Sequence, residues 1–363
     1  METLFPMMII FSYSLVLNSM APLLNSFREL YQISIALSTL LPFFSLTGTV
    51  LSNIFTGVYL NKLGLKRALV IGYALTIIGS IIVAFSNNYY MAMLGLFIFG
   101  LSSGFGFTGS TTLLAQSKNA NFGFYHGAYG LGGIIAPMCI SLSTKLFNDF
   151  RKVYLLYVLL FIALGTYTLF RKIPQLQGIV EKLSFKGIKN AFKDKNFSTF
   201  LSLLILYSSA EIGIITWAGT VIKVGILDVY LSYTLFWLVF TVSRFATGFL
   251  EKTLKSLLRT NATILIFIVI GLFLLKNPLF FVISGLFLGP LFPYMQKNGV
   301  LNVKKEHLTL FNGATYAFTS LGGNIASTIM GITVSKSLII AMLVPLTIMS
   351  AMEYISLKTG KVR

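Results

Sequence analysis

Ionisable side chains are rare within the long apolar runs of this sequence, so those that occur there are the first candidates for chemistry. Glu211 is the only charged residue between Phe197 and Ile222. A carboxylate at the depth of the bilayer centre costs about 3 kcal/mol, and a partner or a function must offset that cost. We expect Glu211 to carry a proton, to accept hydrogen bonds from the hydroxyls of a polar solute, or to bond structurally to a neighbouring helix.

Other side chains that can complete a polar site lie near Glu211 or in other apolar runs. Tyr207 and Ser208 fall one turn before Glu211 on the same helix face. Trp237 can stack on the apolar face of a ligand, whereas the other tryptophan, Trp217, can serve as an interfacial anchor. The remaining candidates for a polar pathway are Asn18, Asn25, Tyr129, Tyr294, Tyr316 and Asn324.

Two basic residues in the apolar runs are weaker candidates. Arg244 lies well past the middle of its run, displaced from the depth of Glu211. This position favours snorkelling, bonding to helix carbonyls, or a gate with Glu251 or the linker over a pair with Glu211. His126 stands in the first turn of its run, where it is either structural or a rim residue of a pathway.

The elements that must position these residues are membrane-spanning helices. Hydrophobic residues make up 56% of the chain and charged residues 10%, against about 25% charged in a soluble domain. A helix needs about 20 mostly apolar residues to cross a bilayer. The sequence predicts an all-α polytopic membrane protein with twelve transmembrane helices, at residues 5–26, 35–59, 67–86, 91–114, 122–145, 153–171, 197–222, 229–250, 257–275, 278–296, 309–334 and 337–355.

The net charge of +18 reports topology rather than a nucleic-acid partner. With both termini in the cytoplasm, most Lys and Arg fall in loops that face inward, which is the positive-inside pattern. We therefore expect a multi-pass plasma-membrane protein with cytoplasmic termini. Its expected partners are the lipid bilayer, a small-molecule substrate and a proton, and we expect a monomer that binds no nucleic acid.

The sequence lacks the residue patterns of several enzyme classes. It contains neither GxxxxGK[ST] nor HExxH, so an ATP-driven pump or a zinc protease of those types is unsupported. Intramembrane transferases and proteases generally need carboxylate pairs, whereas Glu211 is the only acid deep in a predicted span. Cys139 is the single cysteine, so no disulfide can form within the chain. We expect no cofactor, no metal site and no enzymatic activity.

Short repeats divide the chain into two halves. "LGGIIA" at 131–136 recurs as "LGGNIA" at 321–326, "GLF" at 95–97 recurs at 285–287, and "TG" at 56–57 recurs at 247–248. The three offsets are nearly equal, and duplicated halves are common in secondary transporters. We expect a six-helix half at 1–172, a cytoplasmic linker at 173–196 and a second six-helix half at 197–363. The basic, amphipathic linker either lies flat on the inner leaflet or is a solvated connector.

Five motifs carry a family resemblance. They are "GVYLNKLGLKR" (57–67), "FYHGAYGLGGIIAP" (124–137), "YSSAEIGIITW" (207–217), "LFWLVFTVSR" (235–244) and "GLFLGPLFP" (285–293). The first is similar to the loop motif after span two of the major facilitator superfamily, with Asn61 in place of its aspartate. The others resemble the fucose/sugar:proton symporter-like branch. The resemblance covers most of the chain and implies a site between the halves, lined by spans one, four, seven and ten.

The resemblance also implies a cytoplasmic gate, in which basic side chains hold the inner end of one half against carbonyls or acids of the other. The residues assigned to it are Gly57, Asn61, Lys62, Gly64, Lys66, Arg67, Arg244 and Glu251. Glycines in this loop would let span two approach its neighbour closely. Pro290 and Pro293 should break span ten and free carbonyls that a cavity must satisfy.

Taken together, these features predict a secondary active transporter that works by alternating access. It would move a small polar solute, such as a sugar or a related metabolite, coupled to protons through Glu211. Two alternatives stay open, an uncoupled facilitator and an exporter or flippase for a hydrophobic or amphiphilic compound. The phenylalanine-rich spans favour the latter, and the missing carboxylate pair disfavours an intramembrane enzyme.

Overall fold

The helices of the described residues group into twelve segments, the number of spans that the sequence predicts. The computed structural model describes residues 3–117, 122–173, 185–223, 227–246, 254–304 and 307–359, and within these ranges every regular element is a helix. The first six segments are α1 (Leu4–Leu17) with α2 (Met20–Tyr31), α3 (Ile35–Ser38) with α4 (Leu40–Leu63), α5 (Leu65–Ala84), α6 (Tyr89–Ala115), α7 (Phe122–Phe147), and η1 (Phe150–Lys152) with α8 (Val153–Phe170).

After α9 (Phe185–Lys193), the other six segments follow in the same order. They are α10 (Lys195–Val221), α11 (Val229–Ala246), α12 (Leu254–Leu275), α13 (Pro278–Leu288) with α14 (Leu291–Asn302), α15 (Leu308–Val334) and α16 (Leu338–Thr359). Nine segments within the described ranges are long and apolar enough to cross a membrane. Val229–Phe245 and Arg259–Leu275 are shorter apolar helices there.

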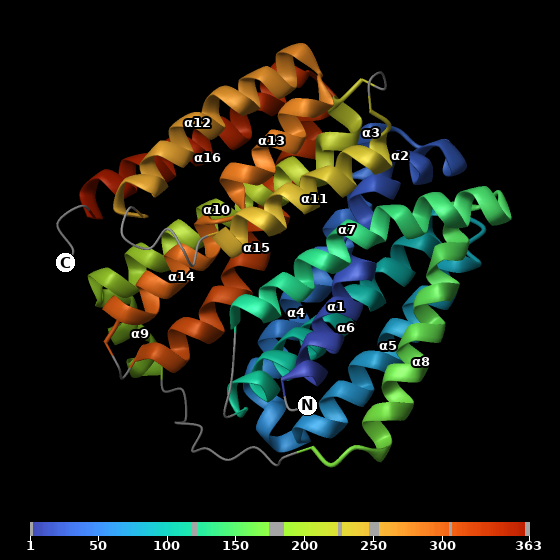
Figure 1. Ribbon diagram of the computed structural model, residues 1–363, viewed down its shortest axis with the longest axis horizontal. Coiled ribbons are helices and arrows are strands. Elements are labelled where there is room, and N and C mark those ends of the chain that lie inside the picture. The colour runs from blue at the N-terminus through green and yellow to red at the C-terminus, as the bar shows by residue number, and fades with distance from the viewer. Residues whose placement is uncertain are drawn as a thin grey trace.

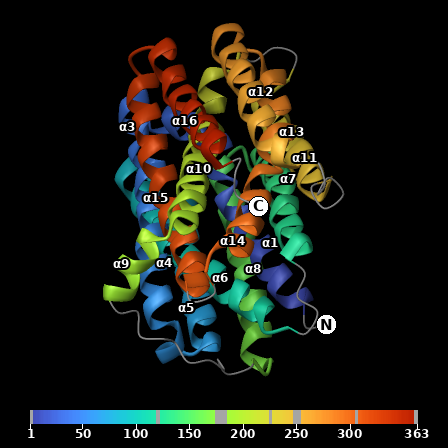
Figure 2. The same cartoon turned by 90° about the vertical axis from the view of Figure 1, so that its left-hand side faces the viewer.

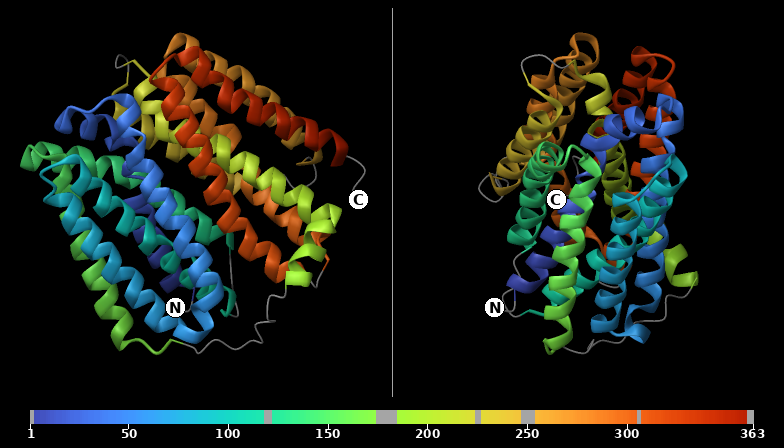
Figure 3. Two further views of the ribbon diagram at one scale, coloured as in Figure 1. Left: turned by 180° about the vertical axis from the view of Figure 1, so that it is seen from behind. Right: turned by 90° about the vertical axis from the view of Figure 1, so that its right-hand side faces the viewer.

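The segments gather into two bodies of six segments each, and the bodies lie side by side (Figure 1). In the first body α4 and α5 pack on α6, and in the second α10 packs on α15 and α11 on α13. Between the bodies α7 contacts α11, α4 contacts α15 and α2 contacts α10. The same division is visible from behind (Figure 3). The domain boundaries at residues 172 and 196 stay predictions.

The long helices run between two ends of the molecule. The linker end carries the N-terminus and α9, and the far end lies opposite (Figure 2). The turn between α2 and α3 and the loop that contains η1 belong to the far end. The turn between α4 and α5 at Gly64 belongs to the linker end, because α4 crosses the molecule from the far end.

The repeated glycine pairs occupy equivalent places in the two bodies. A β-carbon at Gly132 in α7 would lie 2.8 Å from the Phe11 carbonyl oxygen of α1, and one at Gly322 in α15 would lie 2.7 Å from Ser209 Oγ of α10. Span five therefore approaches span one as closely as span eleven approaches span seven. This packing agrees with the internal repeat that the sequence predicts.

Two crossing segments are broken by proline. Pro22 in α2 cannot donate to the Asn18 carbonyl, and α1 ends just before Asn18. Pro293 likewise cannot donate to the Gly289 carbonyl, and α13 ends at Leu288 while α14 begins at Leu291. The predicted break in span ten is confirmed, and it leaves the Gly289 carbonyl without a helical donor near the middle of the molecule.

A charged cluster fixes the far end of the first body. Asp149 accepts hydrogen bonds from Arg151 Nε at Oδ1 and from Arg151 Nη2 at Oδ2, each at 3.0 Å, and Lys152 Nζ lies 3.7 Å from Oδ2. Arg151 Nη1 also donates to the Ser86 carbonyl in the loop between α5 and α6. Partial burial alone would raise the pKa of Asp149, but the bonds from Arg151 and the charge of Lys152 outweigh it and lower that pKa.

We expect the stabilisation that this cluster provides to be lost in acid. Because the folded-state pKa of Asp149 is depressed, its contribution is complete above the unfolded value of about 3.9 and is lost as pH falls below it. Asp149→Asn should lower the free energy of unfolding by roughly 1 kcal/mol at pH 7. Thermal unfolding of the purified variant and wild type between pH 7 and pH 3 measures this. The difference in melting temperature should close toward pH 3, and a constant difference would contradict the assignment.

Candidate functional site

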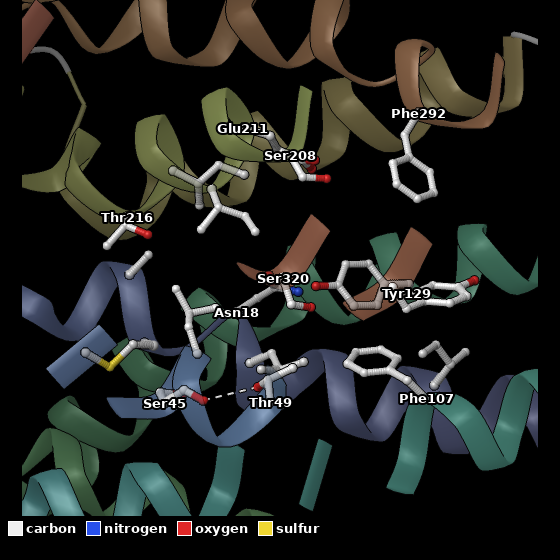
Figure 4. Close-up of a pocket in the computed structure, with 18 of the residues that line it drawn as sticks. Asn18, Ser45, Thr49, Phe107, Tyr129, Ser208, Glu211, Thr216, Phe292 and Ser320 are labelled. Carbon is white, nitrogen blue, oxygen red and sulfur yellow. Dashed lines mark hydrogen bonds between the residues drawn. The ribbon is translucent and has the colours of Figure 1, made fainter. Parts of the chain in front are cut away.

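A cavity of about 270 Å³ lies between the two bodies. Figure 4 shows Ser208, Glu211 and Phe292 on one wall, with Asn18, Ser45, Thr49 and Phe107 on the opposite wall. The lining side chains come from α1, α2, α4, α6 and α7 of the first body and from α10, α11, α14 and α15 of the second. The predicted site residues that line it are Asn18, His126, Tyr129, Ser208, Glu211, Trp237 and Tyr316, together with Arg244.

An ion pair between Glu211 and Arg244 is the main polar feature of the cavity. Arg244 Nη2 lies 3.8 Å from Glu211 Oε1, and the side chains are only 10% (Arg244) and 13% (Glu211) exposed. The expectation that Arg244 lies too far along its helix to pair with Glu211 is wrong. The long arginine side chain spans the axial offset, which counting residues along two separate helices does not reveal.

The broken tenth span holds this pair in place. Arg244 Nε donates to the Gly289 carbonyl at 3.2 Å, and its guanidinium carbon lies 4.2 Å from the centre of the Phe240 ring. Tyr207 donates to the Leu288 carbonyl at 2.9 Å and adjoins both members of the pair. The carbonyls at the break are therefore bonded by side chains of α10 and α11, as a buried helix break requires.

The first body supplies an aromatic and amide wall. Asn18 Nδ2 donates to Ser14 Oγ at 2.8 Å, and Ser14 Oγ donates to the Tyr129 carbonyl, which ties α1 to α7. The Tyr129 ring meets Trp237 edge to face, with centroids 6.0 Å apart. His126 lies beside Phe292 with centroids 6.4 Å apart. These contacts place aromatic rings from both bodies around the ion pair.

Two buried polar atoms on the cavity wall have no hydrogen-bond partner within the part of the chain that the structure describes. One is Trp237 Nε1, on a side chain only 2% exposed. The other is Asn53 Oδ1, on a side chain 8% exposed whose Nδ2 donates to Ser320 at 3.5 Å. Buried polar groups are generally bonded, so both atoms are candidates for contact with a ligand.

Several predicted pathway residues lie elsewhere. Asn25 donates to the Gly219 carbonyl at 2.6 Å, at the far end. Asn324 donates to Thr47 Oγ1 at 2.9 Å, which joins α15 to α4 outside the cavity. Tyr294 lies on α14 and is not among the lining residues. Asn25 and Asn324 therefore connect the two bodies instead of lining the cavity.

The predicted gate differs from expectation where it is described. Lys66 donates to the carbonyls of Leu169 at 2.6 Å and Arg171 at 3.3 Å, so it bonds within its own body and not across to the other. Lys62 lies 5.6 Å from the centre of the Tyr59 ring on its own helix. Arg67 is exposed, and the side chain of Asn61 and the whole of Glu251 lie outside the described residues.

The two glycines of the predicted gate do not mediate close packing. A β-carbon at Gly57 or Gly64 would meet no atom within 4 Å. Gly64 instead has φ +79°, a backbone conformation that favours glycine at the turn from α4 to α5. The close approach of α4 to its neighbour is at Gly48, where a β-carbon would lie 2.7 Å from the Leu101 nitrogen of α6.

The polar face of α4 was missed at the sequence level. Ser45, Thr49 and Asn53 all line the cavity, and Ser320 of α15 lies opposite. Their spacing of four residues puts the three side chains on one helix face. That spacing indicates a polar helix face in span two, but the family resemblance assigns the site to spans one, four, seven and ten.

Comparison with known proteins agrees with this geometry. Residues 6–327 match the family described as the Major Facilitator Superfamily. The chain therefore belongs to this superfamily, whose members are membrane transporters rather than enzymes. It is 25% identical over 219 residues to "Protein TsgA homolog" of Buchnera aphidicola subsp. Baizongia pistaciae, and the match covers 57% of this chain and 55% of that protein. The chain thus matches about half the length of that curated relative.

Solved structures confirm the fold. The structure of the fucose:proton symporter FucP of E. coli superposes with a TM-score of 0.70 at 16% sequence identity, and the match covers 98% of each chain. A structure of FucP in the outward conformation gives a TM-score of 0.67 at 15% identity, again over 98% of each chain. The predicted likeness to this branch is confirmed for the fold, and the protein is a multi-pass membrane transporter.

Proposed function

We propose that the protein moves a small polar solute through the central cavity, coupled to a proton that Glu211 carries. The observation that supports this most is the placement of Glu211, which is the only acidic side chain among the described residues of the cavity lining. Its Oε1 lies 3.8 Å from Nη2 of Arg244 on α11. A carboxylate with a single nearby cation can exchange a proton and change its partner as it does so.

The solute is small. The cavity, at about 270 Å³, falls just below the range of about 300–1,000 Å³ that suits drug-sized ligands. Amide and hydroxyl groups of Asn18, Ser45, Thr49 and Ser208 can bond a polar solute of the size of a sugar or a related metabolite. The aromatic rings around the ion pair can pack on its apolar face.

The contacts that join the two bodies at the far end support alternating access. At the far end Thr220 donates to Asn25 Oδ1 at 3.0 Å, and the hydroxyls of Ser26 and Tyr230 lie 3.3 Å apart. The loop charges predict that the protein lies in the plasma membrane with both termini in the cytoplasm. In that orientation the closed far end faces outward. Transport would require these contacts to part while the linker end closes.

Replacing Glu211 by Gln tests the proton pathway. After a thermal-shift screen of sugars, amino acids, organic acids and amphiphiles has identified a solute, uptake is measured in proteoliposomes. One proton per solute supports about tenfold accumulation per pH unit. Glu211→Gln should abolish this gradient-driven accumulation and retain counterflow exchange, because exchange needs the cavity but no net proton movement.

Glu353→Gln is the matched control, because Glu353 lies on α16 and accepts from Thr263 at 2.9 Å, away from the cavity. It should accumulate solute as wild type does. Unchanged gradient-driven uptake by the Glu211→Gln variant would contradict the proposal.

An uncoupled carrier or exporter for an amphiphile is the second candidate. It is favoured by the apolar side chains of the cavity lining, among them Leu17, Leu46, Phe107, Ile212 and Ile215. Under this alternative the thermal-shift screen would find only amphiphiles, and their movement would be indifferent to a pH gradient and to Glu211→Gln.

A further inference from the structure

We infer that the transported solute is a small organic monoanion, a carboxylate with a partly apolar body, which takes the place of Glu211 on Arg244 when Glu211 is protonated. This inference rests on the proposed function and names its substrate class. Transport would then move one proton and one negative charge together, and the cycle would be electrically neutral.

The charge balance of the cavity carries the inference. Glu211 and Arg244 are the only Asp, Glu, Lys or Arg side chains in the described lining, and both are largely buried. Protonation of Glu211 alone would leave the arginine charge buried without a partner, which is strongly unfavourable. Entry of an anion alone would add a second negative charge beside one cation. A proton and an anion bound together restore the balance, so each promotes binding of the other.

A neutral solute cannot serve in this way. If it bound while Glu211 was protonated, the arginine would still lack a counter-charge. If it bound while Glu211 was ionised, no proton would be required. An electrically neutral sugar therefore fits the ion pair less well than a carboxylate does.

Arg244 is held ready to receive a carboxylate. Its Nε bonds the Gly289 carbonyl and its guanidinium stacks on Phe240, and neither contact involves Glu211. The guanidinium therefore keeps its position when Glu211 becomes neutral. Its planar array of N–H donors matches the two oxygens of a carboxylate.

The other groups that line the cavity indicate the chemistry of the rest of the solute. The unpartnered Trp237 Nε1 offers a hydrogen-bond donor and the unpartnered Asn53 Oδ1 an acceptor, on side chains of opposite bodies. Apolar side chains fill much of the remaining wall. A short carboxylate with an apolar segment and a hydroxyl or amide group satisfies each of these features.

Other titratable groups also face the ion pair, and proton uptake by them must be distinguished from proton uptake by Glu211. The groups that interact electrostatically with Glu211 or Arg244 are Tyr207 on α10, His126 and Tyr129 on α7, and Tyr316 on α15. The one that titrates nearest neutral pH in its free form is histidine. His126→Gln therefore distinguishes the two proton sites, and one proton should still be taken up with each anion in this variant.

The test uses acids paired with their amides: lactate and lactamide, mandelate and mandelamide, phenylacetate and phenylacetamide, hexanoate and hexanamide. Binding to the purified protein is measured by calorimetry in two buffers of different ionisation enthalpy, which counts protons. At least one acid should bind at least tenfold tighter than its amide, with uptake of about one proton. In proteoliposomes its uptake should follow the pH gradient and ignore a potassium–valinomycin potential.

Variants assign the effect to the pair. Glu211→Gln should bind the acid with no proton uptake and with an affinity that no longer varies with pH. Arg244→Gln should lose the preference for the acid, and Arg259→Gln, at an exposed position on α12, should keep it. Should Arg244→Gln not fold, the Glu211→Gln/Arg244→Gln double variant leaves no buried charge and should bind acid and amide alike.

The outcomes separate the inference from the function on which it rests. The inference fails if amides bind as well as acids, if no acid binds, or if uptake rises with an inside-negative potential. The proposed function survives those results if Glu211→Gln still abolishes gradient-driven uptake of a neutral solute. Both fall if Glu211→Gln leaves gradient-driven uptake of an acid intact.

Discussion

Arg244→Gln is expected to destabilise the folded protein by about 3–5 kcal/mol, because it leaves Glu211 buried without its cation. The Glu211→Gln/Arg244→Gln double variant should recover most of that loss, since two neutral amides replace two desolvated charges. Glu211→Gln alone should also be destabilising, because it leaves Arg244 unpaired. The free energy of unfolding in detergent, measured for all four forms of this cycle, gives the coupling between the two side chains.

Arg259→Gln provides the matched control, because the side chain it truncates is exposed on α12. It should change the free energy of unfolding by no more than about 0.5 kcal/mol. A double variant no more stable than the Arg244→Gln single variant would show that the 3.8 Å approach contributes little, and that the two charges are satisfied separately.

Locking α4 to α15 should stop transport. Thr47 and Asn324 belong to different bodies, and Asn324 Nδ2 lies 2.9 Å from Thr47 Oγ1. In a Cys139→Ala background, oxidation of the Thr47→Cys/Asn324→Cys variant should form a disulfide and reduce uptake roughly tenfold or more, because the bodies can no longer separate there. Reduction should restore uptake, and mass spectrometry confirms the bond.

A pair within one body is the control for this experiment. Thr76 on α5 donates to Ser102 on α6 at 2.9 Å, and both side chains are buried away from the cavity. The Thr76→Cys/Ser102→Cys variant should form its disulfide and continue to transport. Full uptake by oxidised Thr47→Cys/Asn324→Cys protein would show that α4 and α15 stay together through the cycle.

Much of the fold could be predicted from the sequence because the membrane imposes long apolar runs and the halves repeat. The break at Gly289–Pro290 could also be predicted, since proline removes a helix hydrogen bond wherever it stands. Glu211 was identified because a lone carboxylate in an apolar run is costly. Each of these features follows from a local property of the chain.

Features that depend on side-chain reach or on which helices become neighbours could not be predicted in the same way. The pairing of Arg244 with Glu211 depends on the length of the arginine side chain and on where α10 and α11 lie relative to each other in the folded protein. The role of Lys66 depends on α8 ending close to it, where the Leu169 carbonyl accepts its hydrogen bond. The spacing of Ser45, Thr49 and Asn53 marks a polar face on α4, but whether that face lines the cavity depends on how the two bodies face each other.

The central claim is that Glu211 carries the proton that moves with the solute. The most direct test is to add solute to proteoliposomes that contain a trapped pH-sensitive dye, with no gradient imposed. Wild-type protein should acidify the interior as solute enters, and Glu211→Gln should move solute by exchange with no change in internal pH. Equal acidification by wild type and Glu211→Gln would contradict the claim.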